Sequence, residues 1–189
     1  MFNTTPKMPK MQELGTYFIP INEMLHCGRT SELAFIIAEK IKCVDKTPEQ
    51  IRQLAFLHDI GKCKISSSIL LKQDKLSHSE RHIIKKHSIY SEQILKTIGY
   101  SDEDTEIVRY HHEKLDGTGY PDGITKIPLS TQIITVADIY DALTRIRIYR
   151  RNVKYSHDEA IFILSSDIGL NQGIVHLLDT IIKGRCQKI

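Results

Sequence analysis

Long hydrophobic runs are absent from this sequence. No uninterrupted apolar stretch approaches the roughly 20 residues that a membrane-spanning helix needs. The first residues, MFNTTPKMPKMQELG, also lack the apolar core of a signal peptide. We therefore expect a cytoplasmic protein that does not associate with membranes.

A strong excess of one charge and closely spaced cysteine pairs are absent too. The formal net charge is only +3, which is too small to predict binding to DNA or RNA polymers. The four cysteines include no C-x-x-C pair, and a cytoplasmic chain keeps its thiols reduced. We expect small, mostly buried thiols rather than disulfides.

Strand patterns are scarce, whereas helical patterns run through most of the chain. Apolar residues recur at helical spacing over 21–41. Thr47, Pro48 and Gln50 have the arrangement of a helix N-terminus, and that helix should extend to the His58–Asp59 pair. Further helices are expected from Ser77 or Ser79 to Gly99, over 101–113, over 130–146, from the capping pair Ser156 and Glu159, and up to a stop at Gly184.

Taken together, these patterns predict a single all-α domain over residues 1–189. The composition is 41% hydrophobic and 26% charged, which is ordinary for a soluble domain with a core. We find no internal repeat and no linker. The segment 114–128 is rich in glycine and contains two prolines, so it should form the main loop.

Two doublets of polar residues end predicted helices: His58 with Asp59, and His111 with His112. Adjacent side chains on a helix diverge by about 100°, so one doublet can reach two different metal ions. His26, His87 and Asp138 are further candidate ligands. Asp138 is conspicuous because burying an unpaired carboxylate in an apolar helix is costly.

Such a ligand set indicates a site for two metals. Two cations roughly 3.5–4 Å apart can share a bridging hydroxide and stabilise both oxygens of a phosphoryl transfer. Imidazoles and carboxylates suit iron, manganese, zinc or cobalt. Asp59 is a plausible bridge, and Lys62 lies about one turn farther on, where its charge can act on the phosphate or the leaving oxygen.

Four other histidines carry no such prediction: His78, His82, His157 and His176. A lone histidine is more often a surface residue or a satisfied core residue than a ligand. His78 and His82 have i,i+4 spacing but lie in a strongly charged stretch, so we expect them to be solvated.

Three motifs occur in a fixed order: HDIGK at 58–62, HHEKLDGTGYP at 111–121 and VADIYDALTRIRIYR at 136–150. They resemble the motifs of the HD-GYP subgroup of bacterial HD-domain metal-dependent phosphohydrolases. The resemblance implies a helical HD-domain bundle with a motif core over about 22–150 and C-terminal helices over 156–185. It also implies hydrolysis of the second messenger cyclic di-GMP to pGpG, and often on to GMP.

The same resemblance assigns roles to individual residues. It implies two divalent transition metals, iron or manganese, with Asp59 bridging them and Lys62 as the catalytic lysine. Arginine suits the substrate side because its planar fork matches phosphate oxygens. The first metal would be held by His26, His58, Asp59 and Asp138, the second by His87, His111 and His112, and the substrate side would include Tyr120, Asp141, Arg147 and Arg150.

The chain also departs from the family pattern. Asn22 replaces a glutamate that in some members binds a third metal, so we expect two metals, and we expect the adjacent Glu23 to point elsewhere. The usual HPxxG is HSIYS, with Ser88 and Ser91, and an arginine before the third motif is Gln132. RPYR is RIYR, with Ile148. These changes predict looser surroundings on the substrate side.

Three functions remain open at this point. The first is a cyclic di-GMP phosphodiesterase. The second is an HD phosphohydrolase acting on another cyclic dinucleotide, such as a mixed GMP–AMP ring, or on a mononucleotide. The third is a non-catalytic signalling module. The expected partners are a cyclic dinucleotide and, among proteins, a GGDEF-type cyclase or a second copy of the chain.

Overall fold

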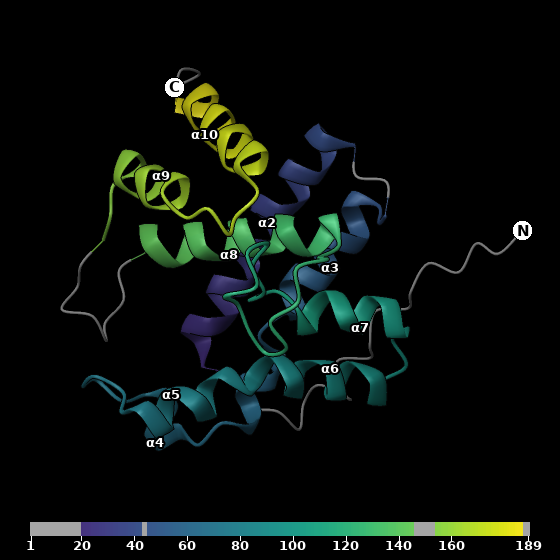
Figure 1. Ribbon diagram of the computed structural model, residues 1–189, viewed down its shortest axis with the longest axis vertical. Coiled ribbons are helices and arrows are strands. Elements are labelled where there is room, and N and C mark those ends of the chain that lie inside the picture. Colours follow the sequence, from purple (N-terminus) through teal and green to yellow (C-terminus); the bar gives the residue numbers. More distant parts are fainter. Residues whose placement is uncertain (1–19, 43–44, 146–153, 187–189) are drawn as a thin grey trace, which may run out of the picture.

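The computed structural model describes residues 20–42, 45–145 and 154–186, and within these ranges it contains helices and no strand. Figure 1 shows α8 crossing the middle of the molecule, with α9 and α10 on one side and α5 and α6 on the other. The predicted all-α fold is therefore confirmed. The elements are α2 (Ile21–Ile41), α3 (Pro48–Leu57), the 3-10 helix η1 (Ile60–Lys64), α4 (Ser67–Leu70), α5 (His78–Lys85), α6 (His87–Thr97), α7 (Asp102–Arg109), α8 (Leu129–Thr144), α9 (His157–Ser165) and α10 (Gln172–Cys186).

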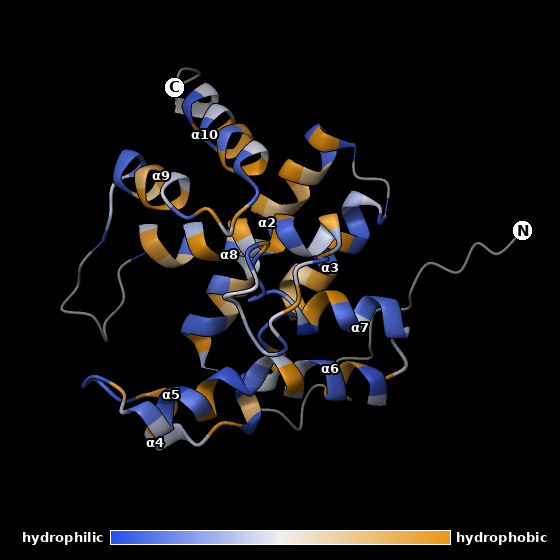
Figure 2. Ribbon diagram, in the orientation of Figure 1, coloured by the Kyte–Doolittle hydropathy of each residue, from blue (hydrophilic) through white to orange (hydrophobic). Residues whose placement is uncertain are grey.

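The core lies where α2, α3 and α8 pack together. Ile37 of α2, Ile51 of α3 and Ile134 of α8 are fully buried in it. Figure 2 shows hydrophobic and hydrophilic residues alternating along these helices, the pattern of helices with one buried face. Burial of these apolar residues holds the three helices together. None of the helices within the described ranges is long and apolar enough to cross a bilayer.

Several predicted helix boundaries are confirmed. Thr47 and Gln50 form a reciprocal capping box at the start of α3, and Ser156 and Glu159 do the same for α9. Gly184 is an exception, because α10 continues through it to Cys186. The predicted stop there is wrong: a glycine lowers helix stability by only about 1 kcal/mol, which is not enough to end a helix.

The expected single helix up to Gly99 is in fact two helices. Ser77 caps α5, and the chain turns at Lys86 before α6 begins at His87. Neither a glycine nor a proline marks this turn. The turn places His87 in the first position of α6 rather than in the middle of a long helix.

Both doublets lie just beyond helix ends. Helix α3 ends at Leu57, so His58 and Asp59 occupy its junction with η1. Helix α7 ends at Arg109, so the second doublet lies in the turn that follows. Side chains in such turns can point to a common centre, because they are not restricted to one helix face.

The loop after α7 is fixed by a buried carboxylate. Glu113 is 2% exposed, and its Oε1 accepts hydrogen bonds from the backbone N–H groups of Asp122 and Gly123 at 2.6 and 2.9 Å. Gly119 packs so closely here that a Cβ atom on it would lie 2.4 Å from the Cα of Glu113. The loop therefore has one compact conformation beside the second doublet.

The C-terminal helices are joined to α8 by a polar chain. The hydroxyl of Tyr140 lies 3.0 Å from Nδ1 of His157, and Nε2 of His157 lies 2.9 Å from Oδ1 of Asp179. These contacts link α8, α9 and α10. His157 is thus a satisfied histidine, as expected, and His78, His82 and His176 are exposed. Among the described cysteines, Cys27 is buried, Cys63 is partly buried, and both are free thiols.

Candidate metal centre

Seven side chains from five segments converge on one small volume. Six of them are less than 10% exposed, and the imidazole of His112 is 23% exposed. Three overlapping groups of three residues can each hold a metal ion, because within each group the ligand atoms all lie within 4.8 Å of one another. The structure therefore brings together the whole predicted ligand set: His26, His58, Asp59, His87, His111, His112 and Asp138.

Asp59 lies at the middle of this cluster, with one carboxylate oxygen on each side. Its Oδ2 is 3.2 Å from Nε2 of His58 and 3.8 Å from Nε2 of His26. Its Oδ1 is 3.1 Å from Nε2 of His87 and 4.0 Å from Nε2 of His111. A carboxylate in this position can ligate two ions at once.

The backbone orients three of the histidines in the same way. Each has Nδ1 at 2.6 or 2.7 Å from the carbonyl oxygen three residues earlier in the chain. A carbonyl can only accept, so each Nδ1 carries a proton, and in the neutral imidazole each Nε2 then presents a lone pair to the cluster. These pairs are His58 with Ala55, His87 with Ile84, and His111 with Val108.

His26 is oriented by a side chain instead. Its Nδ1 lies 2.6 Å from Oδ2 of Asp141, and its Nε2 lies 2.9 Å from Oδ1 of Asp138. Asp141 also accepts hydrogen bonds from the guanidinium of Arg29 at 2.6 and 3.2 Å. The carboxylate of Asp141 is therefore behind His26, where an outer partner of a metal ligand is usually found.

Burial and neighbouring charges shift the pKa values of several groups in the cluster. Burial opposes ionisation of Asp59, but Lys62 and His58 outweigh it and hold the pKa of that carboxyl well below its usual range. Burial and the neighbouring imidazoles lower the pKa of His111, and they lower the pKa of His112 to about 3. His111 and His112 are thus neutral at pH 7, which is the form that binds metals.

The chemistry of the cluster fits divalent metals. Nε2 of His58 and Oδ1 of Asp59 are buried and have no hydrogen-bond partner among the described residues. Nε2 of His87 is 3.2 Å from the Nε2 atoms of both His111 and His112. Lone pairs that meet in this way need a proton or a cation between them, and orphaned buried acceptors are otherwise costly.

Lys62 lies at the edge of the cluster, between two carboxylates. Its Nζ is 2.6 Å from Oδ2 of Asp59 and 2.7 Å from Oε2 of Glu23. Our expectation that Glu23 points elsewhere is therefore wrong. Glu23 precedes His26 by three residues, a spacing that puts both on one face of α2, and this spacing was the signal that could have revealed it.

Tyr120 extends the cluster toward solvent. Its ring stacks on the imidazole of His112, with centroids 4.6 Å apart and planes at 30°. The ammonium of Lys85 lies 4.7 Å from the centroid of the Tyr120 ring, within the range of a cation–π contact. Lys85 was not singled out in the sequence, because an exposed lysine in a charged helix carries no pattern of its own.

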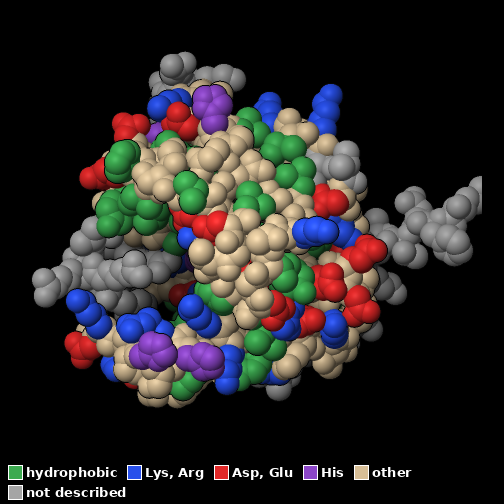
Figure 3. Space-filling model, in the orientation of Figure 1, with side chains coloured by type: hydrophobic (Ala, Val, Ile, Leu, Met, Phe, Trp, Pro, Cys, Tyr) green, Lys and Arg blue, Asp and Glu red, His purple; other side chains and the backbone are tan. Residues whose placement is uncertain are grey.

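Positive side chains gather on the surface over α4 and α5. Figure 3 shows several Lys and Arg side chains and two histidines over the region of α4 and α5. Lys85 is exposed and forms no ion pair within the described ranges. The approach to the cluster from α5 is therefore suited to an anionic molecule.

Ser91, one of the departures from the family pattern, connects two elements through hydrogen bonds. It is fully buried, donates from Oγ to the carbonyl of His58 at 2.8 Å, and accepts from the N–H of Gly61 at 2.8 Å. A Cβ atom on Gly61 would lie 2.1 Å from the carbonyl oxygen of His87. The expectation of looser surroundings does not hold at this position, where α6 and η1 are in backbone contact.

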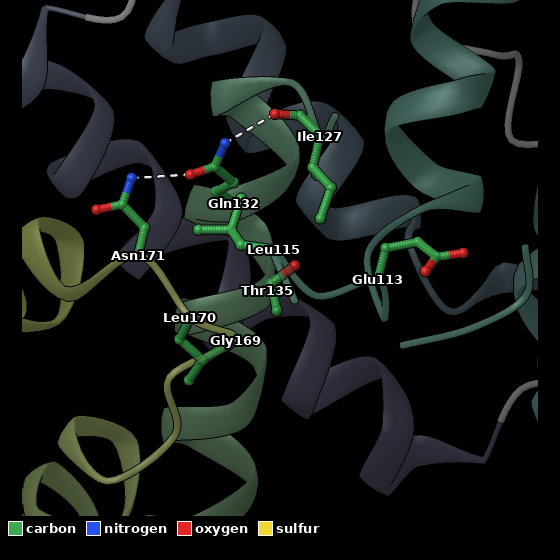
Figure 4. A pocket seen from close by; sticks show the side chains of 8 residues that line it. All are labelled: Glu113, Leu115, Ile127, Gln132, Thr135, Gly169, Leu170 and Asn171. Carbon is green, nitrogen blue, oxygen red and sulfur yellow. Dashed lines mark hydrogen bonds between the residues drawn. The ribbon is translucent and has the colours of Figure 1, made fainter. Parts of the chain in front are cut away.

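Gln132, another departure, also has a structural role. Its Nε2 donates to the carbonyl of Ile127 at 2.7 Å, and its Oε1 accepts from Asn171 at 2.8 Å. Figure 4 shows these two bonds at the wall of a cavity of about 10 Å³, roughly the space of one water molecule. The carboxylate of Glu113 points away from this cavity, so nothing there suggests a second reactive site.

Some predicted residues lie outside the described ranges. They are Arg147 and Arg150, proposed to contact substrate, and Ile148 of the altered RIYR motif. Asn22 is described and partly buried, and its backbone carbonyl accepts a hydrogen bond from Arg145 at 2.5 Å.

Comparisons with known proteins identify the family of this chain. Residues 8–169 match a family profile described as HD domain. The 3'3'-cGAMP-specific phosphodiesterase 3 of Vibrio cholerae is 39% identical over 76% of this chain and 31% of its own length. The cyclic di-GMP phosphodiesterase response regulator RpfG of Xanthomonas campestris is 33% identical over 84% of this chain and 42% of its own. The chain thus spans less than half the length of these relatives.

Solved structures share the fold. A cyclic GMP-AMP specific phosphodiesterase of V. cholerae superposes with a TM-score of 0.61 at 14% identity, covering 84% of this chain and 44% of that one. The HD domain of the phosphodiesterase PgpH of Listeria monocytogenes, in complex with cyclic-di-AMP, gives 0.59 at 16% identity, covering 94% and 96%. At these identities the likeness concerns the fold alone.

Proposed function

Because the chain belongs to the HD-domain family, we propose that it is a metal-dependent phosphodiesterase that hydrolyses cyclic di-GMP. The observation that carries this proposal is Asp59, which has one oxygen toward each of two groups of histidines. The HHEKLDGTGYP segment, over 111–121, supports membership of the HD-GYP subgroup. The products would be pGpG and, after a second hydrolysis, GMP.

The residues fit a binuclear centre of iron or manganese. His26, His58, Asp59 and Asp138 would hold one ion, and His87, His111 and His112 the other. Divalent metals at this place would supply Lewis acidity toward the phosphoryl oxygens and would acidify water. Mixed imidazole and carboxylate ligands accept both iron and manganese, so the metal itself must be identified by analysis of the purified protein.

The chain's own groups would act around these ions. Lys62 would present its ammonium to the phosphate or to the departing 3′ oxygen. Asp141 would orient His26 rather than contact substrate, since His26 and Arg29 already bind both its oxygens. Arg147 and Arg150 remain proposed contacts to the dinucleotide phosphates.

The surroundings of Tyr120 support an anionic substrate. The Tyr120 ring stacks on His112 and contacts the ammonium of Lys85, and this ammonium could pair with a phosphate. Burial and the carboxylates of Asp59 and Asp138 raise the pKa of the Tyr120 hydroxyl. The hydroxyl therefore stays protonated and can donate a hydrogen bond.

A mixed GMP–AMP ring is the second candidate substrate. The relative from V. cholerae that bears that specificity in its name is 39% identical. A ring phosphate would meet the same metals and the same lysine in either substrate. Discrimination between guanine and adenine must come from groups that contact the base edges.

The proposal can be tested on protein purified without oxygen. Metal content is measured first, and the same sample is then incubated with cyclic di-GMP and, separately, with 3'3'-cGAMP. About two metals per chain and linear product from cyclic di-GMP are the expected results. Product from 3'3'-cGAMP alone would assign 3'3'-cGAMP as the substrate in place of cyclic di-GMP. Two metals per chain with no product from either dinucleotide would indicate the non-catalytic signalling role. An Asp59→Ala sample serves as the inactive control.

A further inference from the structure

Glu23 and Asp59 share one ammonium group. Nζ of Lys62 is 2.7 Å from Oε2 of Glu23 and 2.6 Å from Oδ2 of Asp59. The side chains of Glu23 and Lys62 are 22% and 18% exposed, and that of Asp59 is 4% exposed. The lysine thus spans from the buried cluster to a carboxylate at the rim.

We propose that Glu23 is a positioning residue that holds the Lys62 ammonium at the edge of the metal centre and competes with Asp59 for it. The catalytic part of this inference rests on the function proposed for Lys62. A lysine ammonium is a point charge on a flexible four-carbon stem, so one contact does not fix its place. A second carboxylate on a different helix, that of Glu23 on α2, fixes the position of the ammonium.

Competition for Asp59 is the physical reason for such an anchor. Oδ2 of Asp59, which Lys62 contacts, is also the oxygen 3.2 Å from Nε2 of His58. A metal ion at His58 and the ammonium would therefore compete for the same oxygen. Without Glu23, Asp59 would be the sole carboxylate partner of Lys62, and the competition would favour the ammonium more strongly.

Glu23 reaches Lys62 because two short spacings coincide. Glu23 is three residues before His26 on α2, and Lys62 is three residues after Asp59 on η1. Each residue of the pair thus lies about one turn from a proposed metal ligand. An acid in the first turn of a helix also stabilises the helix dipole, and the test must separate that simpler role from positioning.

The first measurement is the turnover of Glu23→Gln, loaded with Mn²⁺, on the cyclic dinucleotide that the wild type hydrolyses. This change keeps the size of the side chain and removes its charge. We expect an unchanged metal stoichiometry, a kcat lowered about 10- to 100-fold, and a KM within about threefold, as for loss of an interaction made in the transition state. In a Lys62→Met background, Glu23→Gln should have no further effect.

Glu32→Gln is the matched control. Glu32 lies on the same helix and pairs with Arg52 at the surface, so the change removes an ion pair from α2 without touching the centre. Its kcat should equal that of the wild type. Equal losses in Glu23→Gln and Glu32→Gln would point to the helix rather than to Lys62 and would overturn the inference.

A second readout does not depend on turnover. Mn²⁺ titration by calorimetry should show weaker binding in Glu23→Gln, about 3- to 10-fold, because Lys62 then pairs with Asp59 alone. In the Lys62→Met background the same change should leave the affinity unaltered. An effect that persists in this background, or the loss of one bound metal per chain, would make Glu23 a direct partner of metal and would contradict positioning.

These experiments keep the two proposals apart. If the wild type hydrolyses no cyclic dinucleotide, the proposed function fails, and the Mn²⁺ titrations still decide whether Glu23 acts through Lys62. If the wild type turns over and Glu23→Gln matches it in both kcat and Mn²⁺ affinity, the positioning role fails while the phosphodiesterase stands.

Discussion

Asp59 is the residue on which the proposed centre depends most. Its two oxygens face different histidines, at 3.2 Å for His58 and 3.1 Å for His87. Its charge is maintained at low pH by Lys62 and the imidazoles, which lower the pKa of the carboxyl. A single side chain thus joins the two halves of the cluster.

Replacing the Asp59 carboxylate should remove metal from both groups of proposed ligands. We expect Asp59→Ala to retain less than one metal per chain and to lose turnover by at least about a thousandfold, since removal of one ligand also uncouples its neighbours. Elemental analysis of the purified variant checks this result. Asp158→Ala, an exposed acid on α9, is the control. Wild-type metal content in Asp59→Ala would contradict the bridging role.

Lys85 offers a different test, on the substrate side. We expect Lys85→Gln to raise KM about 5- to 20-fold with kcat nearly unchanged, because the lost charge would bind ground state and transition state equally. The neighbouring Lys86, which is also exposed, is the matched control for charge on the same segment. A similar rise of KM in Lys86→Gln would mean that the overall positive charge of this surface, and not Lys85 itself, binds the substrate.

At the scale of helices, the junction between α6 and η1 sets the geometry of the HD motif. Ser91 joins the two elements through the carbonyl of His58 and the N–H of Gly61. Gly61 admits no side chain, because a Cβ atom would overlap the backbone of His87. Two proposed metal ligands, His58 and His87, are thereby fixed relative to each other.

Ser91→Ala should therefore destabilise the fold by about 2–3 kcal/mol, since two buried backbone groups would lose their partner. Urea unfolding of the metal-free protein measures this change. Ser88 is equally buried but donates only to the carbonyl of Lys85 within its own turn, so Ser88→Ala should cost less than about 1 kcal/mol. Equal costs for the two serines would argue against a special role of the junction.

Helix starts were easier to predict than helix ends. Capping residues are local, and so the starts of α3 and α9 follow from Thr47 and Ser156 alone. The turn at Lys86 has no local signal, and it directly precedes His87, which is buried in the cluster. Gly184 is the reverse case: the glycine predicted a helix end, but α10 continues through it to Cys186.

At the scale of the whole molecule, the sequence was most informative about which histidines and aspartates cluster. Histidine and aspartate doublets have few roles at a buried site, so their chemistry was readable before their positions were known. The contacts of Glu23 and Lys85 were missed because they depend on how separate helices meet. The substrate contacts proposed for Arg147 and Arg150 stay predictions.

The spread of the ligands over the fold predicts that metal stabilises it. His26 lies on α2, His87 on α6 and Asp138 on α8, so an unfolded chain cannot offer the site. At a Mn²⁺ concentration about 100 times Kd we expect about 2.7 kcal/mol of added stability. For a chain of this size that corresponds to a rise in Tm of about 5–10 °C.

Differential scanning calorimetry with and without Mn²⁺ measures this rise. Asp59→Ala should show little or none of it. A wild-type Tm that does not respond to Mn²⁺ would mean that the cluster is stable without metal or does not bind it.

The distance along the chain between the first and last ligands also bears on synthesis. Within this chain His26 is made before the other proposed ligands, whereas Asp138 on α8 is made after all of them. A nascent chain that stops before α8 would have imidazoles but an incomplete set of carboxylates. Metal should therefore be acquired late, once α8 has joined α2, and chains arrested before that point should neither retain iron or manganese nor be active.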